Sequence, residues 1–482
     1  MADSAAPEEL DSAPRLSDGG AAASQEKRDV RAGTGNPYEA LTALQRVAGS
    51  PALVVDTSAA DGPLRIVMVS DAGEARRVLA DSSLLKGPQT SEPFMSIVPQ
   101  HLIAVEGAVH ARLRKVAASV LNDQVRGRLS GIALRHARAL VGQLRGRSEG
   151  RAVVVCDLDR LVRAVALDTI SEGIFGTPWG AIVDYSRSNT KAHALAQLMY
   201  VLHARVTDLT DRRWREPGAW GGSEDEAATW RRVLVPFVRA EISSARAGAG
   251  AAQSMLCEWI AQEPSLSDAE LENLCLTFLT MGHENVSSGI AWTLVQLAEN
   301  PAAQDSVRAQ VARSAFWRKE CAGELNGEAG VFEALAELTL VEQAFLESAR
   351  LYPSVPVISR MATTDTVVAG YRIPAGTEVV FNLYGLNRDT EAWGEDAAQF
   401  ACPRSKPIQV DDPSYWSFGA GARPCVGRPL SGAESKAVVA TLLMAFSLTS
   451  ASDQKVQANN LVSLRPGQHA IRLTPLTTSS RL

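Results

Sequence analysis

The chain has 482 residues, a formal net charge of -6 and 21% charged residues. Its size and apolar content are sufficient for the core of one large domain, and no apolar run reaches the ~20 residues of a membrane-spanning helix. There is no basic domain and no basic-then-apolar export signal, so we expect a soluble cytoplasmic protein that neither binds nucleic acid nor is exported. The six cysteines are scattered without paired or metal-type spacing, which argues against a disulfide framework or a zinc site.

The first 33 residues are rich in Ala, Ser, Gly and acidic residues and contain almost no large apolar side chains. Such a composition buries too little apolar surface to offset the entropy of ordering. Residues 1–33 are therefore predicted to be a disordered extension, and 34–482 an ordered domain. A helical pattern begins at Asn36, and two β-rich stretches at 52–56 and 64–69 predict a hairpin.

A helical pattern over 71–79 is followed by a stretch, 82–103, that contains several prolines. We predict that this stretch is irregular, and long irregular segments inside a compact chain are usually functional or disordered. Its Phe94 and Met95 favour a flap that faces a substrate.

His110 and Arg114 lie four positions apart, which places them on one face of a predicted helix. Taken alone, this pair is most simply a solvated basic face. The pattern from 124 to 247 is mostly amphipathic helix, and a break rich in Trp and Gly around 217–222 separates two of these helices.

A long helix is predicted from a capping motif at Ser267 to a proline at 301. Its middle reads Met281-Gly-His-Glu284-Asn285. Glycine weakens a helix, and a carboxylate inside a mostly buried helix is costly. The residues of this turn therefore do not serve the stability of the helix, which indicates a functional role.

Cys425 lies in a glycine-rich loop, Phe418-Gly-Ala-Gly-Ala-Arg423-Pro-Cys425-Val-Gly427, and a helical pattern follows it. An axial sulfur ligand to haem iron requires a thiolate, which amides and a helix N-terminus stabilise, while glycines let the backbone approach a flat macrocycle. The alternative is a buried cysteine in an ordinary loop. Six fixed residue types at fixed spacing make a chance match improbable, so we predict that Cys425 binds iron.

This loop resembles the cysteine loop of the cytochrome P450 family of haem-thiolate monooxygenases, which reads Phe-Gly-x-Gly-x-Arg-x-Cys-x-Gly. Further matches in the same order extend the resemblance over roughly residues 36–474. The resemblance implies a mainly α fold with small β-sheets, in which one large domain holds haem b between a long central helix and the Cys-ligand loop. It also implies a soluble, bacterial type of member, more narrowly an actinobacterial one.

The resemblance also implies roles for individual residues. Cys425 would be the metal ligand. The residues that bind the cofactor would be His110, Arg114, Arg360, Phe418, Arg423 and Gly427, with the cations pairing with haem propionates. The catalytic residues would be Gly282, which leaves space for dioxygen, and Glu284 and Asn285. The substrate pocket would be lined by Phe94, Met95, Phe278, Met281, Val355, Val357 and Ile358. Glu347 and Arg350, three positions apart on one helix, would be a structural pair.

The turn departs from the family pattern at Asn285, which stands where a threonine is usual. Cleavage of the O–O bond needs protons from groups within hydrogen-bond reach, and an amide relays a proton less readily than a hydroxyl. The departure therefore favours oxidative cyclisation or coupling through a new C–N, C–C or C–O bond. Hydroxylation or epoxidation remains an alternative, and a haem protein that binds a ligand without turnover is a second one.

The expected substrate is a hydrophobic small molecule, aromatic or peptide-derived, from secondary metabolism such as antibiotic biosynthesis. The resemblance implies electron supply by a ferredoxin and a ferredoxin reductase, and we expect a monomer that binds no membrane. The ferredoxin is expected to dock near the cysteine loop, on a basic patch of Arg112, Lys115, Arg404, Lys406 and Arg428.

Overall fold

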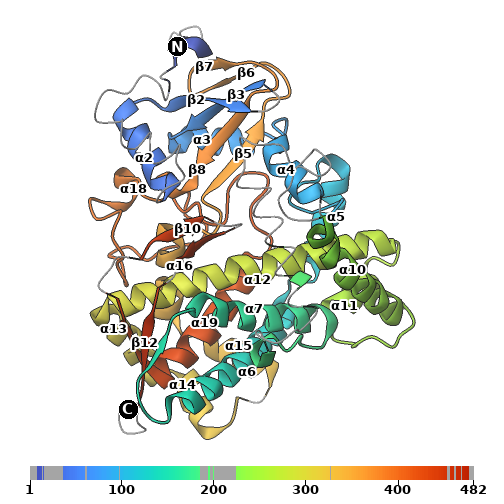
Figure 1. Ribbon diagram of the computed structural model, residues 1–482, viewed down its shortest axis with the longest axis vertical. Coiled ribbons are helices and arrows are strands. Elements are labelled where there is room, and N and C mark those ends of the chain that lie inside the picture. Colours follow the sequence, from blue (N-terminus) through green and yellow to red (C-terminus); the bar gives the residue numbers. More distant parts are fainter. Residues whose placement is uncertain are drawn as a thin grey trace.

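The computed structural model describes residues 8–13, 15, 36–59, 62–96, 98–184, 191, 194–195, 199, 224–325, 327–452, 456–460, 463–467 and 469–476. A sheet lies at one end of the molecule and a larger helical part at the other, with helix α12 between them (Figure 1). The helices are α2 (Pro37–Ala48), α3 (Ala72–Ala80), α4 (Pro88–Met95), α5 (Gly107–Ser119), α6 (Asp123–Ser148), α7 (Leu158–Phe175), α8 (Ala181–Asp184), α10 (Glu224–Arg246), α11 (Met255–Gln262), α12 (Asp268–Glu299), α13 (Pro301–Arg313), α14 (Ala315–Ala322), α15 (Glu328–Ala336), α16 (Thr339–Leu351), α17 (Leu383–Leu386), α18 (Thr390–Trp393) and α19 (Arg428–Ala445). The prediction of a mainly α fold with small β-sheets is confirmed.

Helix α12 is the central element of the helical part, and it has the predicted bounds. The Ser267 side chain accepts a hydrogen bond from the Glu270 amide, and the Glu270 carboxylate binds back to the Ser267 amide, which completes a capping box. The helix ends at Glu299, and Asn300 separates it from the proline that opens α13. Helices α7, α16 and α19 pack against it, so most of its side chains are buried.

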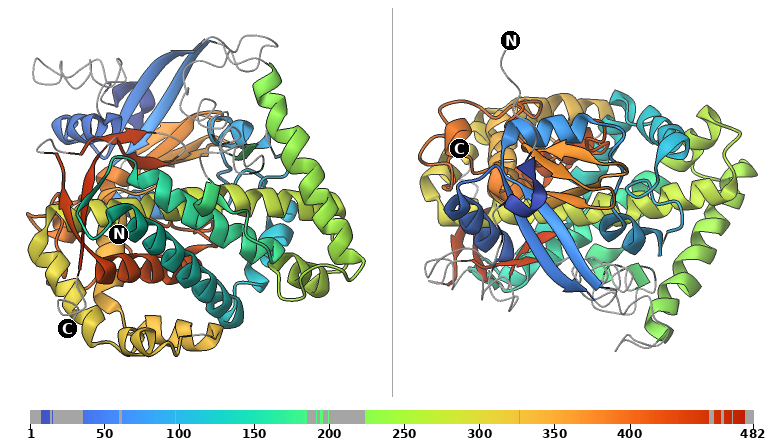
Figure 2. Two further views of the ribbon diagram at one scale, coloured as in Figure 1. Left: turned by 60° about the horizontal axis from the view of Figure 1, so that its bottom comes forward. Right: turned by 90° about the horizontal axis from the view of Figure 1, so that it is seen from above.

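The largest sheet has the strand order β2-β3-β8-β5. The predicted hairpin is present as β2 (Ala52–Ala59) and β3 (Gly62–Val69), and Figure 2 shows it extending beyond the rest of the sheet. Strand β8 (Glu378–Asn382) lies parallel to β3 and antiparallel to β5 (Val357–Met361). This sheet matters for the site because β5 carries Arg360.

Three smaller groups of strands complete the described structure. Strand β6 (Thr366–Val368) pairs with β7 (Tyr371–Ile373), and β12 (Ile471–Pro475) lies between β4 (Val153–Val155) and β9 (Phe446–Ser450). Strands β10 (Ala458–Asn460) and β11 (Leu464–Pro466) form an antiparallel pair beside α12. The Ser288 hydroxyl and the Trp292 indole, both on α12, donate to the Leu464 carbonyl.

The prediction of disorder over 1–33 is wrong at residues 8–13. Strand β1 (Glu8–Glu9) pairs in parallel with β7, and a short 3-10 helix, η1 (Leu10–Ser12), follows it. Leu10 and Ala13 are buried against the same core as the β2, β3 and β8 side chains. Pairing with an existing sheet edge gives the backbone its hydrogen bonds, so few apolar side chains suffice, and a composition averaged over 33 residues does not reveal this.

The predicted irregular stretch 82–103 contains a helix, α4, so that prediction is wrong for residues 88–95. Pro88 stands at the start of α4, where the missing N–H breaks no helical hydrogen bond, although Pro93 lies inside the helix. The predicted break at 217–222 lies outside the described residues. In the part of the chain that the structure describes, no helix combines the length and the apolar character needed to cross a membrane.

Candidate functional site

Cys425 lies in the connection that leads into α19. Its amide donates to the Phe418 carbonyl at 2.8 Å, which closes the loop. Gly421 has a φ of 72°, and a Cβ there would lie 2.0 Å from the Leu79 carbonyl oxygen. That glycine is therefore required by the close approach of α3, rather than by a cofactor. A Cβ at Gly427 would meet only the Cys425 Sγ, at 3.9 Å, so the protein leaves room beside the sulfur.

The surroundings of the sulfur have opposing effects. Solvent reaches the Cys425 side chain, although protein atoms surround it on most sides. Burial raises the pKa of its thiol, while the amides of Gly427 and Arg428 and the charge of Arg114 oppose that rise. These amides at the start of α19 are hydrogen-bond donors that a thiolate needs, so the site suits a metal that replaces the thiol proton.

Basic side chains from four parts of the chain gather next to the cysteine loop. They are Lys86, His110, Arg114, Arg360 and Arg423. The Glu106 carboxylate interacts with four of them, namely Lys86, His110, Arg360 and Arg423. Burial and the neighbouring positive charges lower the pKa of Lys86 to about 7 and that of Arg360 to about 10. An excess of buried positive charge is costly, and the two propionates of haem would supply the missing negative charge. The residues present therefore fit the expected cofactor.

Members of this basic cluster have partners that the sequence did not indicate. Arg423 pairs with Glu106 at 2.6 Å and donates to the Val105 carbonyl at 2.8 Å. Its guanidinium thus has a carboxylate from the protein, which was not expected for a propionate ligand. Arg114 donates to the Pro424 carbonyl at 2.7 Å and so ties α5 to the cysteine loop. Lys86 and Glu106 were missed, because nothing in their spacing links them to the other bases.

Helix packing, and not the expected space for dioxygen, explains why position 282 is a glycine. An added Cβ would lie 2.9 Å from the Cγ1 of Ile170, so the missing side chain faces helix α7. The expectation that Gly282 leaves space for dioxygen is therefore corrected: its small size allows α12 and α7 to pack closely.

Glu284 is buried, with 2% of its surface exposed, and it faces β11. Its Oε1 accepts from the Ser463 hydroxyl and from the Nε of Arg465, each at 2.8 Å. Although burial alone would raise its pKa, Arg465 and Arg163 hold the pKa well below its usual range. Glu284 is thus a fixed anion in an internal ion pair, and sequence reasoning missed its partner Arg465.

Asn285, the residue that departs from the family pattern, is half-buried on the next position of α12. Its Nδ2 lies 4.0 Å from the Sδ of Met281, one helical turn earlier. Its carbonyl accepts from the Ser354 hydroxyl at 2.9 Å. Asn285 and Met281 therefore share a face that differs from the one on which Glu284 meets β11.

The predicted pocket residues fall into two groups. Phe278 is buried and packs edge-on against Trp259, with the two ring centroids 5.1 Å apart. This packing makes it a core residue rather than a pocket wall. Phe94 is buried as well, and its ring centroid lies 4.9 Å from that of His101. The other predicted pocket residues are partly or more fully exposed, and they are Met95, Met281, Val355, Val357 and Ile358.

Glu347 and Arg350 form the predicted pair on α16, and neither is exposed by more than 1%. Arg350 binds both carboxylate oxygens, at 2.7 and 2.8 Å, and donates to the carbonyls of Asn387 and Ala397. Arg404 binds the same carboxylate at 3.0 Å. The expected docking patch therefore loses Arg404, whose side chain is 7% exposed, whereas Arg112, Lys115, Lys406 and Arg428 are exposed.

The sequence is similar to those of known proteins. The family model described as Cytochrome P450 matches residues 57–472. The chain is 32% identical to a cytokinin hydroxylase of Arabidopsis thaliana over 195 residues, which cover 40% of this chain and only 36% of that protein. It is 24% identical over 433 residues to the cytochrome P450 monooxygenase ptmK of Penicillium ochrochloron, with 86% of this chain and 81% of the relative covered. It is 26% identical over 416 residues to cytochrome P450 714B1 of Oryza sativa subsp. japonica, with 82% and 73% covered. These relatives come from plants and a fungus, so the bacterial type stays a prediction.

Proposed function

Because the chain belongs to the cytochrome P450 family, we propose that it is a haem-thiolate oxidase that closes a ring in, or couples two parts of, a hydrophobic small molecule. The proposed substrate is an aromatic or peptide-derived natural-product intermediate of secondary metabolism. The family carries haem with a cysteine thiolate as axial ligand, and Cys425 stands at that position of the loop. Bound haem supplies the oxidising power that it draws from dioxygen and two electrons.

The observation that carries this proposal is the chemical character of two side chains on one turn of α12, Glu284 and Asn285. Glu284 is held as an anion by Arg465, and Asn285 offers an amide where a hydroxyl is usual. Neither group is suited to pass protons readily toward the haem side of α12. Protons must then come from ordered water or from the N–H and O–H groups of the substrate.

A substrate that gives up its own hydrogens fits this arrangement. In a coupling reaction, two X–H bonds of the substrate break and one C–N, C–C or C–O bond forms. The two hydrogens, two further protons and two electrons from the redox partner reduce dioxygen to two water molecules, so no oxygen is inserted. The chain's own contribution is to hold the substrate against the haem, while ordered water delivers the two further protons.

Conventional hydroxylation is the second candidate, and a specific observation favours it. The Arabidopsis thaliana relative is named a hydroxylase, and the chain is 32% identical to it over the aligned 195 residues. A haem protein that binds a ligand without turnover is a weaker alternative. For electron supply we propose a separate ferredoxin and its reductase, which dock on the exposed Arg112, Lys115, Lys406 and Arg428 near the cysteine loop. Another relative, from Oidiodendron maius (strain Zn), is named self-sufficient, and the chain matches 19% of its length.

The experiment that tests the proposal is turnover of candidate aromatic and peptide-derived metabolites under ¹⁸O₂, with a surrogate ferredoxin and reductase. Mass spectrometry should find a product lighter than the substrate by two hydrogens and free of ¹⁸O. A product heavier by one ¹⁸O would instead support hydroxylation. Asn285→Thr restores the hydroxyl and should shift the products toward oxygen insertion. If product identity and yield stay the same in that variant, Asn285 has no bearing on the reaction.

A further inference from the structure

Arg465 extends from β11 to the middle of α12, and only 1% of its surface is exposed. Its Nε donates to the Glu284 carboxylate at 2.8 Å, and its Nη2 donates to the Glu284 main-chain carbonyl at 2.7 Å. The same Nη2 donates to the Ser287 hydroxyl at 3.0 Å. One guanidinium thus binds the side chain and the backbone of a single helical residue, a geometry that its planar set of donors allows and a lysine ammonium does not.

The next carbonyl of α12 is also bound from outside the helix. The Ser354 hydroxyl donates to the Asn285 carbonyl at 2.9 Å, and the Leu464 amide donates to the Ser354 carbonyl at 2.9 Å. Two consecutive carbonyls, at 284 and 285, therefore accept hydrogen bonds from side chains of other segments. Extra donors to helix carbonyls fix the local orientation of the backbone, because each carbonyl oxygen has a second lone pair to use.

We propose that Arg465 is a positioning residue for the turn of α12 that carries Asn285. It fixes the backbone of this turn against β11 and keeps the Glu284 carboxylate on the side away from Met281 and Asn285. The position of Asn285, and with it the access of water to the reacting oxygen, then depends on a residue of a different segment. This inference rests on the proposed function, because it assumes that Asn285 faces the haem.

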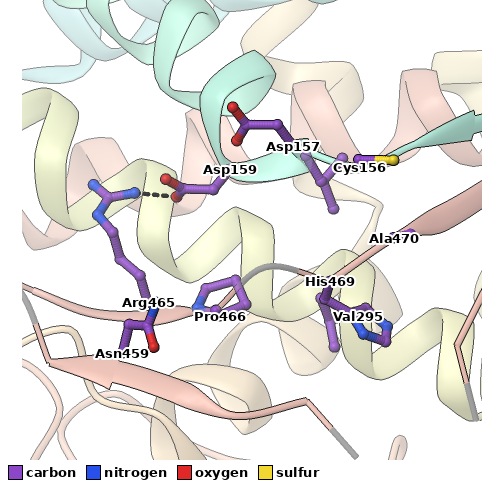
Figure 3. Close-up of a pocket in the computed structure, with 11 residues that line it drawn as sticks. Cys156, Asp157, Asp159, Val295, Asn459, Arg465, Pro466, His469 and Ala470 are labelled. Carbon is purple, nitrogen blue, oxygen red and sulfur yellow. Dashed lines mark hydrogen bonds and ion pairs between the residues drawn. The ribbon is translucent and has the colours of Figure 1, made fainter. Parts of the chain in front are cut away.

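The outer end of this network is open to a pocket. The Nη1 of Arg465 binds the carboxylate of Asp159 at the start of α7, and Figure 3 shows this pair at a pocket of about 550 Å³. The pocket lies between α7, α12, the strands β10 and β11 and the residues just before β12, and Cys156, Asp157, Asn459 and His469 also line it. A pocket of this size admits a small ion to the place of the Arg465 guanidinium, which makes chemical rescue possible.

The test compares Arg465→Ala with the wild-type holoenzyme in two measurements. The first is the rate of hydrogen peroxide release with surrogate redox partners and no substrate, normalised to the haem that binds carbon monoxide. The second is amide hydrogen exchange at residues 284–289. Both should increase about tenfold, the effect of losing a charge-assisted hydrogen bond. Guanidinium chloride at low concentration should restore both values, and the same concentration of urea should not.

Matched variants separate positioning from general stability. Arg128→Ala breaks another ion pair of a buried arginine, the one with Glu258 at 2.8 Å, and should leave both values unchanged. Arg465→Lys keeps the charge but cannot bind the side chain and the backbone of Glu284 together, so it should give an intermediate increase in both values. This variant replaces Arg465→Ala in the test if the alanine variant loses its haem.

Wild-type values in Arg465→Ala, or equal rescue by urea, would overturn the proposal. Amide exchange needs no turnover, so it tests the role of Arg465 even if the proposed ring closure proves wrong.

Discussion

Arg465 binds Glu284 twice, once at the carboxylate, 2.8 Å away, and once at the main-chain carbonyl oxygen, 2.7 Å away. The two residues are 181 positions apart in the chain and both are buried. Burying two charges costs several kcal/mol per ion unless each is well paired, so such a pair holds a fixed geometry. Glu284 is thereby a fixed anion at the turn that also carries Asn285, and this fact underlies the proposed reaction.

His283 should make the protein sensitive to acid. It is fully buried, its Nδ1 lies 2.6 Å from the Leu279 carbonyl oxygen, and burial lowers its pKa to about 4 from an ordinary value of 6.5. The unfolded chain therefore takes up a proton that the folded protein refuses between these two pH values. The stability due to the neutral ring is complete above pH 6.5 and is lost as the pH falls toward 4, by an amount on the order of 1–3 kcal/mol.

The measurement is the free energy of unfolding in urea at pH 7.5, 5.5 and 4.5 for the wild type and His283→Gln. The variant should lose part of the slope between pH 6.5 and 4.5. His101 and His110, whose pKa values are also lowered by burial, should account for the slope that remains in the variant. An unchanged slope would show that His283 is not buried in its neutral form.

Lys86→Gln should have opposite effects on the protein without and with haem. Burial and the charges of Arg360 and Arg423 lower the pKa of Lys86 to about 7 from 10.5. The folded apoprotein thus disfavours the charged lysine, and this penalty is present below pH 7 and disappears as the pH rises toward 10.5. Removing the charge should stabilise the apoprotein near pH 7 and speed the release of haem, because a propionate loses its partner.

The two effects are measured by urea unfolding of the apoprotein at pH 7 and pH 9.5, and by the rate of haem transfer to a scavenging apoprotein. The stabilisation should be smaller at the higher pH. Equal haem release by the variant and the wild type would mean that Lys86 does not contact the cofactor.

Gly282→Ala should destabilise the protein through Ile170. The added Cβ would lie 2.9 Å from the Ile170 Cγ1, and overpacking of this kind costs roughly 1–3 kcal/mol. In an Ile170→Ala background the clash is absent, and the same change should stabilise the helix by up to about 1 kcal/mol. A double-mutant cycle in urea measures the difference. A similar loss of stability in both backgrounds would mean that Gly282 is needed for another reason, such as space near the haem.

Glu347→Gln should be far more damaging than the same change in an exposed pair. Glu347 and Arg350 are almost fully buried, and removing one partner of a buried ion pair costs about 3–5 kcal/mol. Glu74 and Arg77 have the same spacing, but the Arg77 side chain is 52% exposed, so Glu74→Gln should cost about 1 kcal/mol or less. Urea unfolding compares the two variants, and equal costs would contradict a structural role for Glu347 beyond that of a surface pair.

Local motifs were the part of the site that the sequence could predict. The cysteine loop, the capping box of α12 and the Glu347/Arg350 pair each depend on residues within one turn or loop, and their spacing indicates their geometry. Lys86, Glu106 and Arg465 could not be predicted in this way. Their partners lie on distant segments, as Glu106 and Arg423 do at 317 positions apart, and only the packing of the chain brings them together.

Some predictions failed because one residue type serves two purposes. A glycine in the middle of α12 predicts either space for a ligand or close packing of helices, and the sequence does not distinguish the two. The position of Ile170 decides for packing. Phe278 fails likewise, because an aromatic side chain on a buried helix can line a pocket or fill the core, and Trp259 places it in the core.

The most direct test of the account is the absorption spectrum of the reduced, haem-loaded protein under carbon monoxide, for the wild type, Cys425→Ala and Cys402→Ala. Cys402 is a half-buried thiol outside the loop, so its variant controls for general effects of removing a cysteine. The wild type and Cys402→Ala should show the red-shifted band of haem with a thiolate ligand, and Cys425→Ala should lack it. A thiolate band that persists in Cys425→Ala, or a wild-type protein that binds no haem, would contradict the assignment of Cys425 as the iron ligand.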